Sequence, residues 1–237
     1  MKKINIFLQP IRCFMFIITF ILLSLSTKSD MNDLSKWWSV VAVFINFATI
    51  ALLFFICKAK HISYKQLIGY ERKVTKTKSV ILISLMILVI GMGGMYLAGF
   101  ICYRKFPYMA VMMIQPLPVA LAIINIFVLP ITTTLAEDGL YLGLGVNQID
   151  NKWLAIFLPA FFYALQHSFI PVIWDFNYMI YRFLSFLPLT VLMCYMYYKK
   201  RNPVPFMIGH FIINIATVAQ ILLTSISPEI FEMMKAM

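Results

Sequence analysis

Residues 79–103 read SVILISLMILVIGMGGMYLAGFICY and contain no Lys, Arg, Asp or Glu. An α-helix rises about 1.5 Å per residue, so about 20 apolar residues cross the roughly 30 Å of hydrocarbon in a bilayer. This run is long enough to cross a membrane alone. It predicts a transmembrane helix, and several other stretches of the chain repeat the pattern.

The composition of the whole chain also predicts a membrane protein. Of its 237 residues, 62% are hydrophobic and 12% are charged, against about 45–50% and about 25% in an ordinary soluble domain. These are too few charged side chains to cover a surface that faces water. The four cysteines lie far apart in or beside apolar runs and are expected to pack as small apolar residues. A secreted domain held by disulfide bonds is therefore a poor interpretation.

The net charge of +11 gathers in a few segments between the apolar runs. These segments are the loop 58–78, Lys199 to Arg201, and the N-terminal group Lys2, Lys3 and Arg12. Cationic loops usually remain in the cytoplasm, where they meet anionic lipid. We therefore expect a multi-pass plasma-membrane protein with a cytoplasmic N-terminus. Its basic loops would contact anionic headgroups, and no nucleic-acid partner is expected.

Five stretches predict firm spans, namely residues 37–57, 79–103, 153–174, 183–198 and 202–228. Residues 13–23 follow basic residues as in a signal peptide, but the cleavage pattern is weak and we expect a retained helix. In the uncharged stretch 106–136, proline residues either kink one long span or separate two short spans near Pro130. The predicted fold is an all-α polytopic transmembrane helical bundle of seven or eight spans, and the loop charges favour seven.

A few ionisable residues interrupt the apolar runs, where a charge at mid-bilayer costs roughly 2.5–3.5 kcal/mol. They are Glu137, Asp138, His167, Arg182 and His210. Asn214 follows His210 by four residues, so a helix would place both on one face. A single His or Asn in a membrane helix can serve as a hydrogen bond between helices. Two adjacent carboxylic acids are harder to explain by packing alone, and they point to a polar cavity.

Three short motifs occur in a fixed order along these runs: Glu137-Asp138, Tyr163-Ala-Leu-Gln-His167 and His210-Phe-Ile-Ile-Asn214. Together they resemble the intramembrane CPBP proteases, the family of CAAX prenyl endopeptidases and bacteriocin-processing proteins that is also called Abi. The motifs of that family are Glu-Glu-x-x-x-Arg, Phe-x-x-x-His and His-x-x-x-Asn. The similarity covers roughly residues 125–220. It divides the chain into N-terminal transmembrane helices (1–105), a core with the motifs (106–226) and a short tail (227–237).

The resemblance implies an endopeptidase that cuts a membrane-associated protein or peptide. Glu137 and His167 would activate the attacking water, and His210 and Asn214 would stabilise the oxyanion, with Asp138 and Tyr163 in support. The sequence does not establish a cofactor. Glu137, His167 and His210 could, however, hold a zinc ion with an open position for water, so the sequence leaves a metalloprotease and a glutamate-dependent protease both open.

Two positions depart from the family pattern. Asp138 stands for the second glutamate, and Leu142 stands where the family has an arginine, so the carboxylate–guanidinium pair within that helix cannot form. We expect Arg182 or Arg104 to replace the arginine if the pair is needed. The loss of the arginine also motivates an alternative, a non-catalytic protein of the same fold that acts in bacteriocin immunity or as a membrane scaffold. A proton-coupled transporter is a weaker alternative because no inverted repeat is evident.

Overall fold

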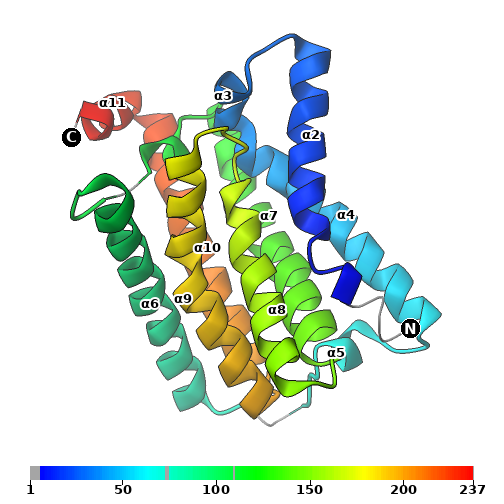
Figure 1. Cartoon of the computed structure of the whole chain (residues 1–237). Coiled ribbons are helices and arrows are strands. Elements are labelled where there is room, and N and C mark those ends of the chain that lie inside the picture. The colour runs from blue at the N-terminus through cyan, green and yellow to red at the C-terminus, as the bar shows by residue number, and fades with distance from the viewer. Residues whose placement is uncertain (1–5, 73–74, 109, 237) are drawn as a thin grey trace.

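The computed structural model describes residues 6–72, 75–108 and 110–236, and its regular elements are helices (Figure 1). The α-helices are α2 (Ile11–Thr27), α3 (Met31–Leu34), α4 (Trp38–Ala59), α5 (Tyr64–Leu67), α6 (Thr77–Tyr103), α7 (Val119–Thr133), α8 (Lys152–Leu165), α9 (Phe176–Lys200), α10 (Val204–Ile226) and α11 (Pro228–Ala236). The 3-10 turns are η1 (Ser35–Trp37), η2 (Val111–Ile114) and η4 (Gln166–Ser168), and η3 (Thr134–Val146) is π-helical. The predicted all-α bundle is confirmed, and the expected tail contains a helix.

Five helical segments in the described part of the chain are long and apolar enough to cross a membrane. They are Met31–Ala59, Thr77–Tyr103, Val119–Val146, Phe176–Lys200 and Val204–Ile226. The chain is a multi-pass integral membrane protein. The firm span predicted over 153–174 is wrong in its extent, because α8 has 14 residues, about 21 Å, and ends at Leu165. The polar turn η4 and a non-helical segment complete that stretch, which an uncharged run does not reveal.

The segment Val119–Val146 settles the choice between one span and two. Helix α7 runs through Pro130 and continues directly into η3, so the division near Pro130 that eight spans required is not present. Proline removes one backbone donor, and local π-helical adjustment together with Ser or Thr side chains compensates for it in membrane helices. Thr134 Oγ1 donates to the carbonyl of Pro130 itself at 2.8 Å, one turn after the Ile126 carbonyl that the proline leaves without its usual donor. The same segment carries Glu137 and Asp138.

Short helix α5 fixes the beginning of η3 from outside the spans. Tyr64 donates its hydroxyl to the carbonyl of Leu135 at 2.7 Å. Burial raises the pKa of Tyr64, so the hydroxyl keeps its proton and remains a donor over the ordinary pH range. A loop residue thereby anchors the backbone two residues before Glu137.

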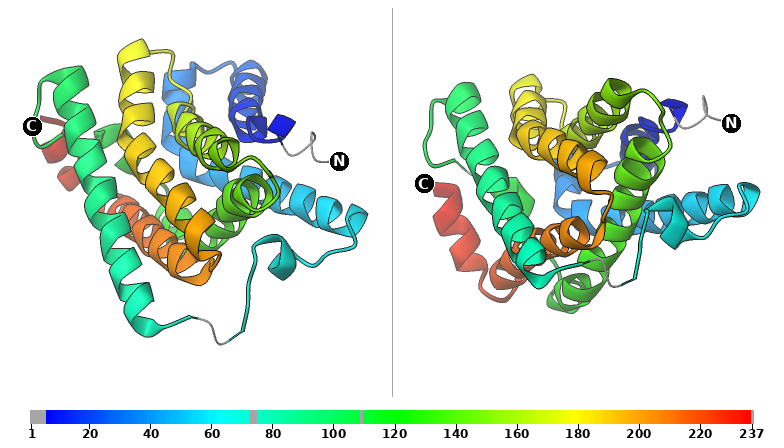
Figure 2. Two further views of the ribbon diagram at one scale, coloured as in Figure 1. Left: turned by 60° about the horizontal axis from the view of Figure 1, so that its bottom comes forward. Right: turned by 90° about the horizontal axis from the view of Figure 1, so that it is seen from below.

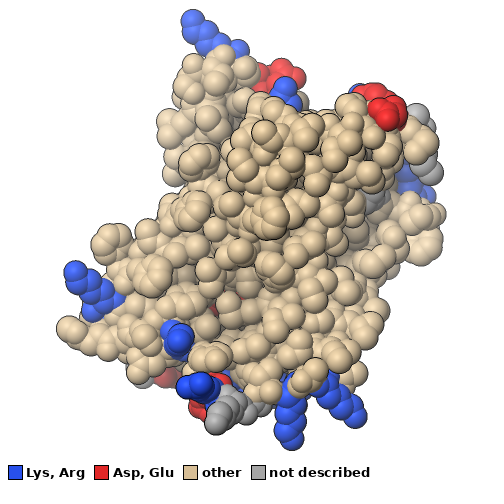
Figure 3. Space-filling view, turned by 180° about the vertical axis from the view of Figure 1, so that it is seen from behind, with Lys and Arg blue, Asp and Glu red and all other residues tan. Residues whose placement is uncertain are grey.

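The long helices pack side by side, with α9 between α6 and α8 and α10 between α6 and α7 (Figure 2). The segments 60–72, 75–76, 147–151 and 201–203 lie toward one end of the bundle, the lower end in Figure 1. The described part of the basic loop and Lys199 to Arg201 therefore share that end, as the loop charges predict. Figure 3 shows charged side chains mostly toward the two ends of the face in view, with an uncharged band between them. Lys2, Lys3 and Lys73 lie outside the described residues, and the cytoplasmic side stays a prediction.

Helices α6 and α9 approach closely at Gly94. A Cβ atom on Gly94 would clash with the carbonyl oxygen of Ser185, whereas a Cβ on the adjacent Gly93 would meet no atom within 4 Å. The two glycines share a helix and differ in what faces them. They therefore form a matched pair for testing this contact.

We expect Gly94→Ala to destabilise the protein by about 1–3 kcal/mol, because the backbone of α9 has to move to admit the methyl group. Gly93→Ala should leave stability unchanged or raise it by up to about 1 kcal/mol, since alanine favours the helix. Thermal unfolding of both variants in the same detergent measures the difference. Equal unfolding temperatures would contradict the packing described.

Candidate active site

One cavity of about 300 Å³ lies inside the bundle. The predicted residues Glu137, His167, His210 and Asn214 all line it, and they come from η3, η4 and α10. Tyr163 of α8 lines it as well. The structure therefore brings the three motifs to one place.

Glu137 enters the cavity with its two carboxylate oxygens in different surroundings. Oε1 accepts a hydrogen bond from Arg12 Nη2 at 2.9 Å, which is also an ion pair. Oε2 is buried and has no hydrogen-bond partner among the described residues, with His210 Nε2 at 3.6 Å. One oxygen is thus fixed, and the other is available to a water or a substrate.

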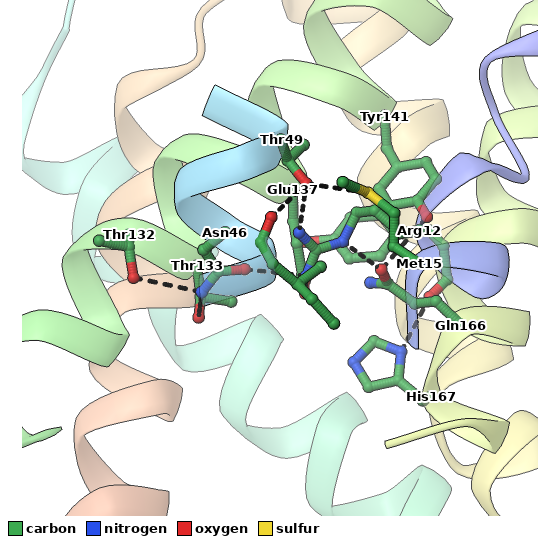
Figure 4. Close-up of polar contacts among 12 residues, drawn as sticks. Arg12, Met15, Asn46, Thr49, Thr132, Thr133, Glu137, Tyr141, Gln166 and His167 are labelled. Carbon is green, nitrogen blue, oxygen red and sulfur yellow. Dashed lines mark hydrogen bonds and ion pairs between the residues drawn. The ribbon is translucent and has the colours of Figure 1, made fainter. Parts of the chain in front are cut away.

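Arg12 is the residue that sequence reasoning placed wrongly. Its position in the sequence predicts a charged residue outside the bundle, like its basic N-terminal neighbours. Instead Arg12 is 1% exposed and makes four hydrogen bonds inside the bundle (Figure 4). Besides Glu137 it donates to Asn46 Oδ1 at 2.9 Å, Thr49 Oγ1 at 3.0 Å and Gln166 Oε1 at 2.6 Å. These partners lie on α4 and η4, so the guanidinium group of α2 joins several elements of the bundle.

The expected replacements for the motif arginine are not used. Arg182 is buried on α9, but its Nε donates to the carbonyl of His167 at 3.4 Å and its guanidinium lies over the ring of Phe186. Arg104 is exposed at the end of α6. Neither pairs with a carboxylate among the described residues.

Asp138 holds His210 from the side opposite Glu137. His210 Nδ1 lies 3.2 Å from Asp138 Oδ1, and the hydroxyl of Tyr163 donates to the same oxygen at 3.1 Å. That hydroxyl also lies 3.1 Å from His210 Nδ1. The other ring nitrogen, Nε2, faces Glu137. Asp138 therefore sets the orientation of His210, and the shorter aspartate is long enough to reach it.

His167 presents its second nitrogen for chemistry. Its Nδ1 lies 2.8 Å from the backbone carbonyl of Tyr163, and a carbonyl can only accept, so we assign the proton to Nδ1. Nε2 then carries the lone pair. The ring stacks on Phe186 with 3.5 Å between the ring centroids, which fixes its plane.

Asn214 supplies an unused donor. Its Nδ2 is buried and has no hydrogen-bond partner within the described chain, and it lies on the helix turn that follows His210. An amide donor in a cavity shielded from water can stabilise negative charge that develops there.

The residues do not fit a metal site. No group of three or more His, Cys, Asp or Glu side chains that could hold a metal ion occurs in residues 6–72, 75–108 and 110–236. Glu137 Oε2 and His210 Nε2 face each other at 3.6 Å, but no third such side chain among the described residues completes a group with them. The possible zinc ligands Glu137, His167 and His210 are therefore not assembled as a set.

Residues 118–216 match the family described as type II CAAX prenyl endopeptidase Rce1-like. This segment, which is less than half of the chain, is similar to Rce1-like endopeptidases of the CAAX protease type. The resemblance predicted from the three motifs is confirmed, and the motif residues from Glu137 to Asn214 lie inside the match. Arg12 and α2 lie outside it. No curated protein and no solved structure matches the chain.

Two substitutions at this Rce1-like site test whether Asp138 acts by orienting His210 or whether the side chains around His210 only fill space. Asp138→Asn should lower kcat for peptide cleavage by about 10- to 100-fold, as loss of an orienting partner of a histidine commonly does. Tyr163→Phe introduces the aromatic residue of the family motif and keeps the Asp138–His210 contact. It should retain nearly full activity and cost on the order of 1 kcal/mol of stability. Equal losses of kcat in the two purified variants would contradict this assignment.

Proposed function

We propose that the chain is an intramembrane endopeptidase of the CAAX-protease type that hydrolyses a peptide bond of a membrane-associated protein or peptide. The observation that carries the proposal is the shared cavity. It combines Glu137, His167, His210 and Asn214 from three elements, and two buried polar atoms of these four residues, Glu137 Oε2 and Asn214 Nδ2, have no hydrogen-bond partner in the described chain. Buried polar atoms without partners are costly, which favours a ligand or a reacting group at this place.

In the proposed reaction, Glu137 and His167 activate the water. A water that donates to Glu137 Oε2 becomes more nucleophilic as its proton moves to the carboxylate, and a carboxylate or imidazole base typically contributes 10²–10⁴-fold. The water oxygen then bonds to the carbonyl carbon of the substrate. The same proton later passes to the leaving amine as the carbon–nitrogen bond breaks. The unprotonated Nε2 of His167 supports the water from the wall formed by η4.

His210 and Asn214 would hold the oxyanion that forms on the carbonyl oxygen. The ring of His210 is fixed by Asp138, and both of its nitrogens face carboxylates, so Nε2 can carry a hydrogen and donate it. Asn214 Nδ2 offers a second donor from the same helix face. Removing one such donor typically costs about 2.7–4 kcal/mol of transition-state stabilisation.

The ion pair between Arg12 and Glu137 counts against the non-catalytic alternative. That alternative was based on Leu142, which removes the guanidinium partner that the family motif supplies. Arg12 provides a guanidinium at Glu137 from another helix. We therefore favour the enzyme over an immunity protein or scaffold, with Glu137 as the base.

The decisive variant is Glu137→Gln, which keeps the size of the side chain and removes the base. In detergent-solubilised protein incubated with a peptide library, cleavage should fall by at least about 100-fold. Glu229→Gln is a matched control, because Glu229 is exposed on α11, and it should cleave as the wild type does. Wild-type cleavage by the Glu137→Gln variant would refute the proposed mechanism.

A further inference from the structure

We infer that Arg12 is a positioning residue for Glu137. It takes the place of the arginine that the family motif has at the position of Leu142. The inference rests on the proposed function. It makes α2, which lies outside the Rce1-like segment, a part of the active site. Nothing in the family match assigns a role to residues before 118.

The surroundings of Arg12 form a built guanidinium site. Its four acceptor oxygens belong to residues that are at most 2% exposed. A buried cation is costly unless it is paired and hydrogen-bonded, and here both conditions hold. The pair with Glu137 supplies the opposite charge, and the three neutral acceptors use three of the four remaining N–H donors of the planar group.

The acceptors are themselves held in place. The amide nitrogen of Asn46 donates to Thr132 Oγ1 at 3.2 Å and to Thr133 Oγ1 at 2.8 Å, which turns its oxygen toward Arg12. Gln166 Oε1 also accepts from Tyr141 at 3.2 Å. Asn46 and Gln166 are therefore held in place by contacts that do not involve Glu137. The fixed guanidinium then determines which oxygen of Glu137 it binds.

Through this geometry Arg12 affects catalysis by orienting Glu137, although Arg12 itself touches neither the substrate nor the attacking water. By binding Oε1, it leaves Oε2 as the oxygen that faces His210 and the cavity. Without Arg12, the carboxylate could rotate and would lie buried next to Asp138 without its counter-ion. The expected loss is therefore in kcat, with little change in KM.

The test compares Arg12→Gln, Arg12→Lys, the double variant Arg12→Leu with Leu142→Arg, and the control Arg104→Gln. Arg12→Gln should lower kcat by at least about 100-fold and change KM little. Arg12→Lys should be intermediate because it keeps charge and loses the planar fork. The double variant should recover at least about tenfold over Arg12→Gln, and the exposed Arg104 should be dispensable. Wild-type kcat in a folded Arg12→Lys or Arg12→Gln variant would overturn the inference.

A second measurement separates this inference from the proposed function. Unfolding temperatures are measured for Arg12→Gln, Glu137→Gln and their combination. A direct pair predicts that the double variant unfolds at about the temperature of the less stable single variant, because each change has already broken the pair. Strictly additive losses would overturn the pairing, whether or not any peptide is cleaved.

A different observation carries a second proposal, about Arg182. We propose that Arg182 binds a carboxylate of the peptide substrate. Arg182 is 4% exposed and lines the same cavity, yet no carboxylate lies within 4.0 Å of its guanidinium among the described residues. Both nearby acids are engaged elsewhere, Glu137 by Arg12 and Asp138 by His210.

Arg182 is also close to the proposed reaction centre. Its Cζ lies 5.0 Å from the centre of the Phe186 ring, and the His167 ring lies 3.5 Å from that same centre. The guanidinium is therefore at most 8.5 Å, the sum of these distances, from the imidazole. A substrate anion within a few residues of the scissile bond could reach it.

The experiment uses two pairs of peptides based on one cleaved sequence. The first pair differs only at the C-terminus, which is a free carboxylate or an amide. The second pair differs only at one internal position, which is Asp or Asn. Wild type should prefer one acidic form by about 10- to 100-fold in kcat/KM, and the pair that shows the preference identifies the source of the carboxylate. Arg182→Met should abolish the preference, so that kcat/KM falls by about 10- to 100-fold more for the acidic form than for the neutral form. An unchanged preference, or an equal loss on both forms, would overturn the proposal.

Binding of the same peptides to Glu137→Gln protein keeps this test independent of turnover. Tighter binding of the acidic form that disappears in Glu137→Gln with Arg182→Met supports the carboxylate site even if no cleavage is found. Equal binding of acidic and neutral forms counts against it. Absence of cleavage of any peptide by wild type would instead refute the proposed function.

Discussion

The burial of charge inside an apolar bundle is the constraint on which this structure depends. Arg12 and Glu137 lie 2.9 Å apart and are almost inaccessible to solvent. Taking two ions out of water is expensive, and their mutual attraction offsets that cost only when geometry is good and further hydrogen bonds complete each group. The Asn46, Thr49 and Gln166 side chains complete Arg12. Helices α2 and α4, the turn η4 and the segment η3 are therefore tied to one another through a single guanidinium.

The π-helical segment η3 explains how two adjacent acids serve two different partners. Glu137 faces Arg12 and the cavity, whereas Asp138 faces His210 and Tyr163. Widened turns are common at functional sites and accommodate a proline nearby. Pro130 of α7 lies seven residues before Glu137, and the anchored carbonyl of Leu135 lies two residues before it. The backbone irregularity and the site chemistry thus occupy the same short segment.

Much of this arrangement could be predicted from the sequence because apolar periodicity and length act locally. The run 79–103 appears as α6, and the spacing of His210 and Asn214 correctly placed both on one cavity. The extent of 153–174 was overestimated because charge-free residues can form a turn as well as a helix. Arg12 was missed because a basic residue near the N-terminus resembles a solvated flank, and its partner is 125 positions away in the chain. The absent arginine at 142 signalled that a replacement was needed without saying which helix would provide it.

The two carboxylates of the site share a pattern that separates positioning from reaction. Each is held through one oxygen, Glu137 by Arg12 and Asp138 by His210 and Tyr163, and in each the second oxygen has no hydrogen-bond partner in the described chain. A buried acceptor without a partner costs about 1–3 kcal/mol, so two of them form a real penalty in a marginally stable fold. Residues that break a local rule at a cost to stability concentrate at functional sites. At Glu137 the free oxygen faces the cavity, whereas Asp138 does not line it. The carboxylate of Glu137 is therefore a base at the cavity wall, whereas the carboxylate of Asp138 is a fixed support behind His210. The two roles differ because Arg12 of α2 holds Glu137, whereas His210 of α10 and Tyr163 of α8 hold Asp138.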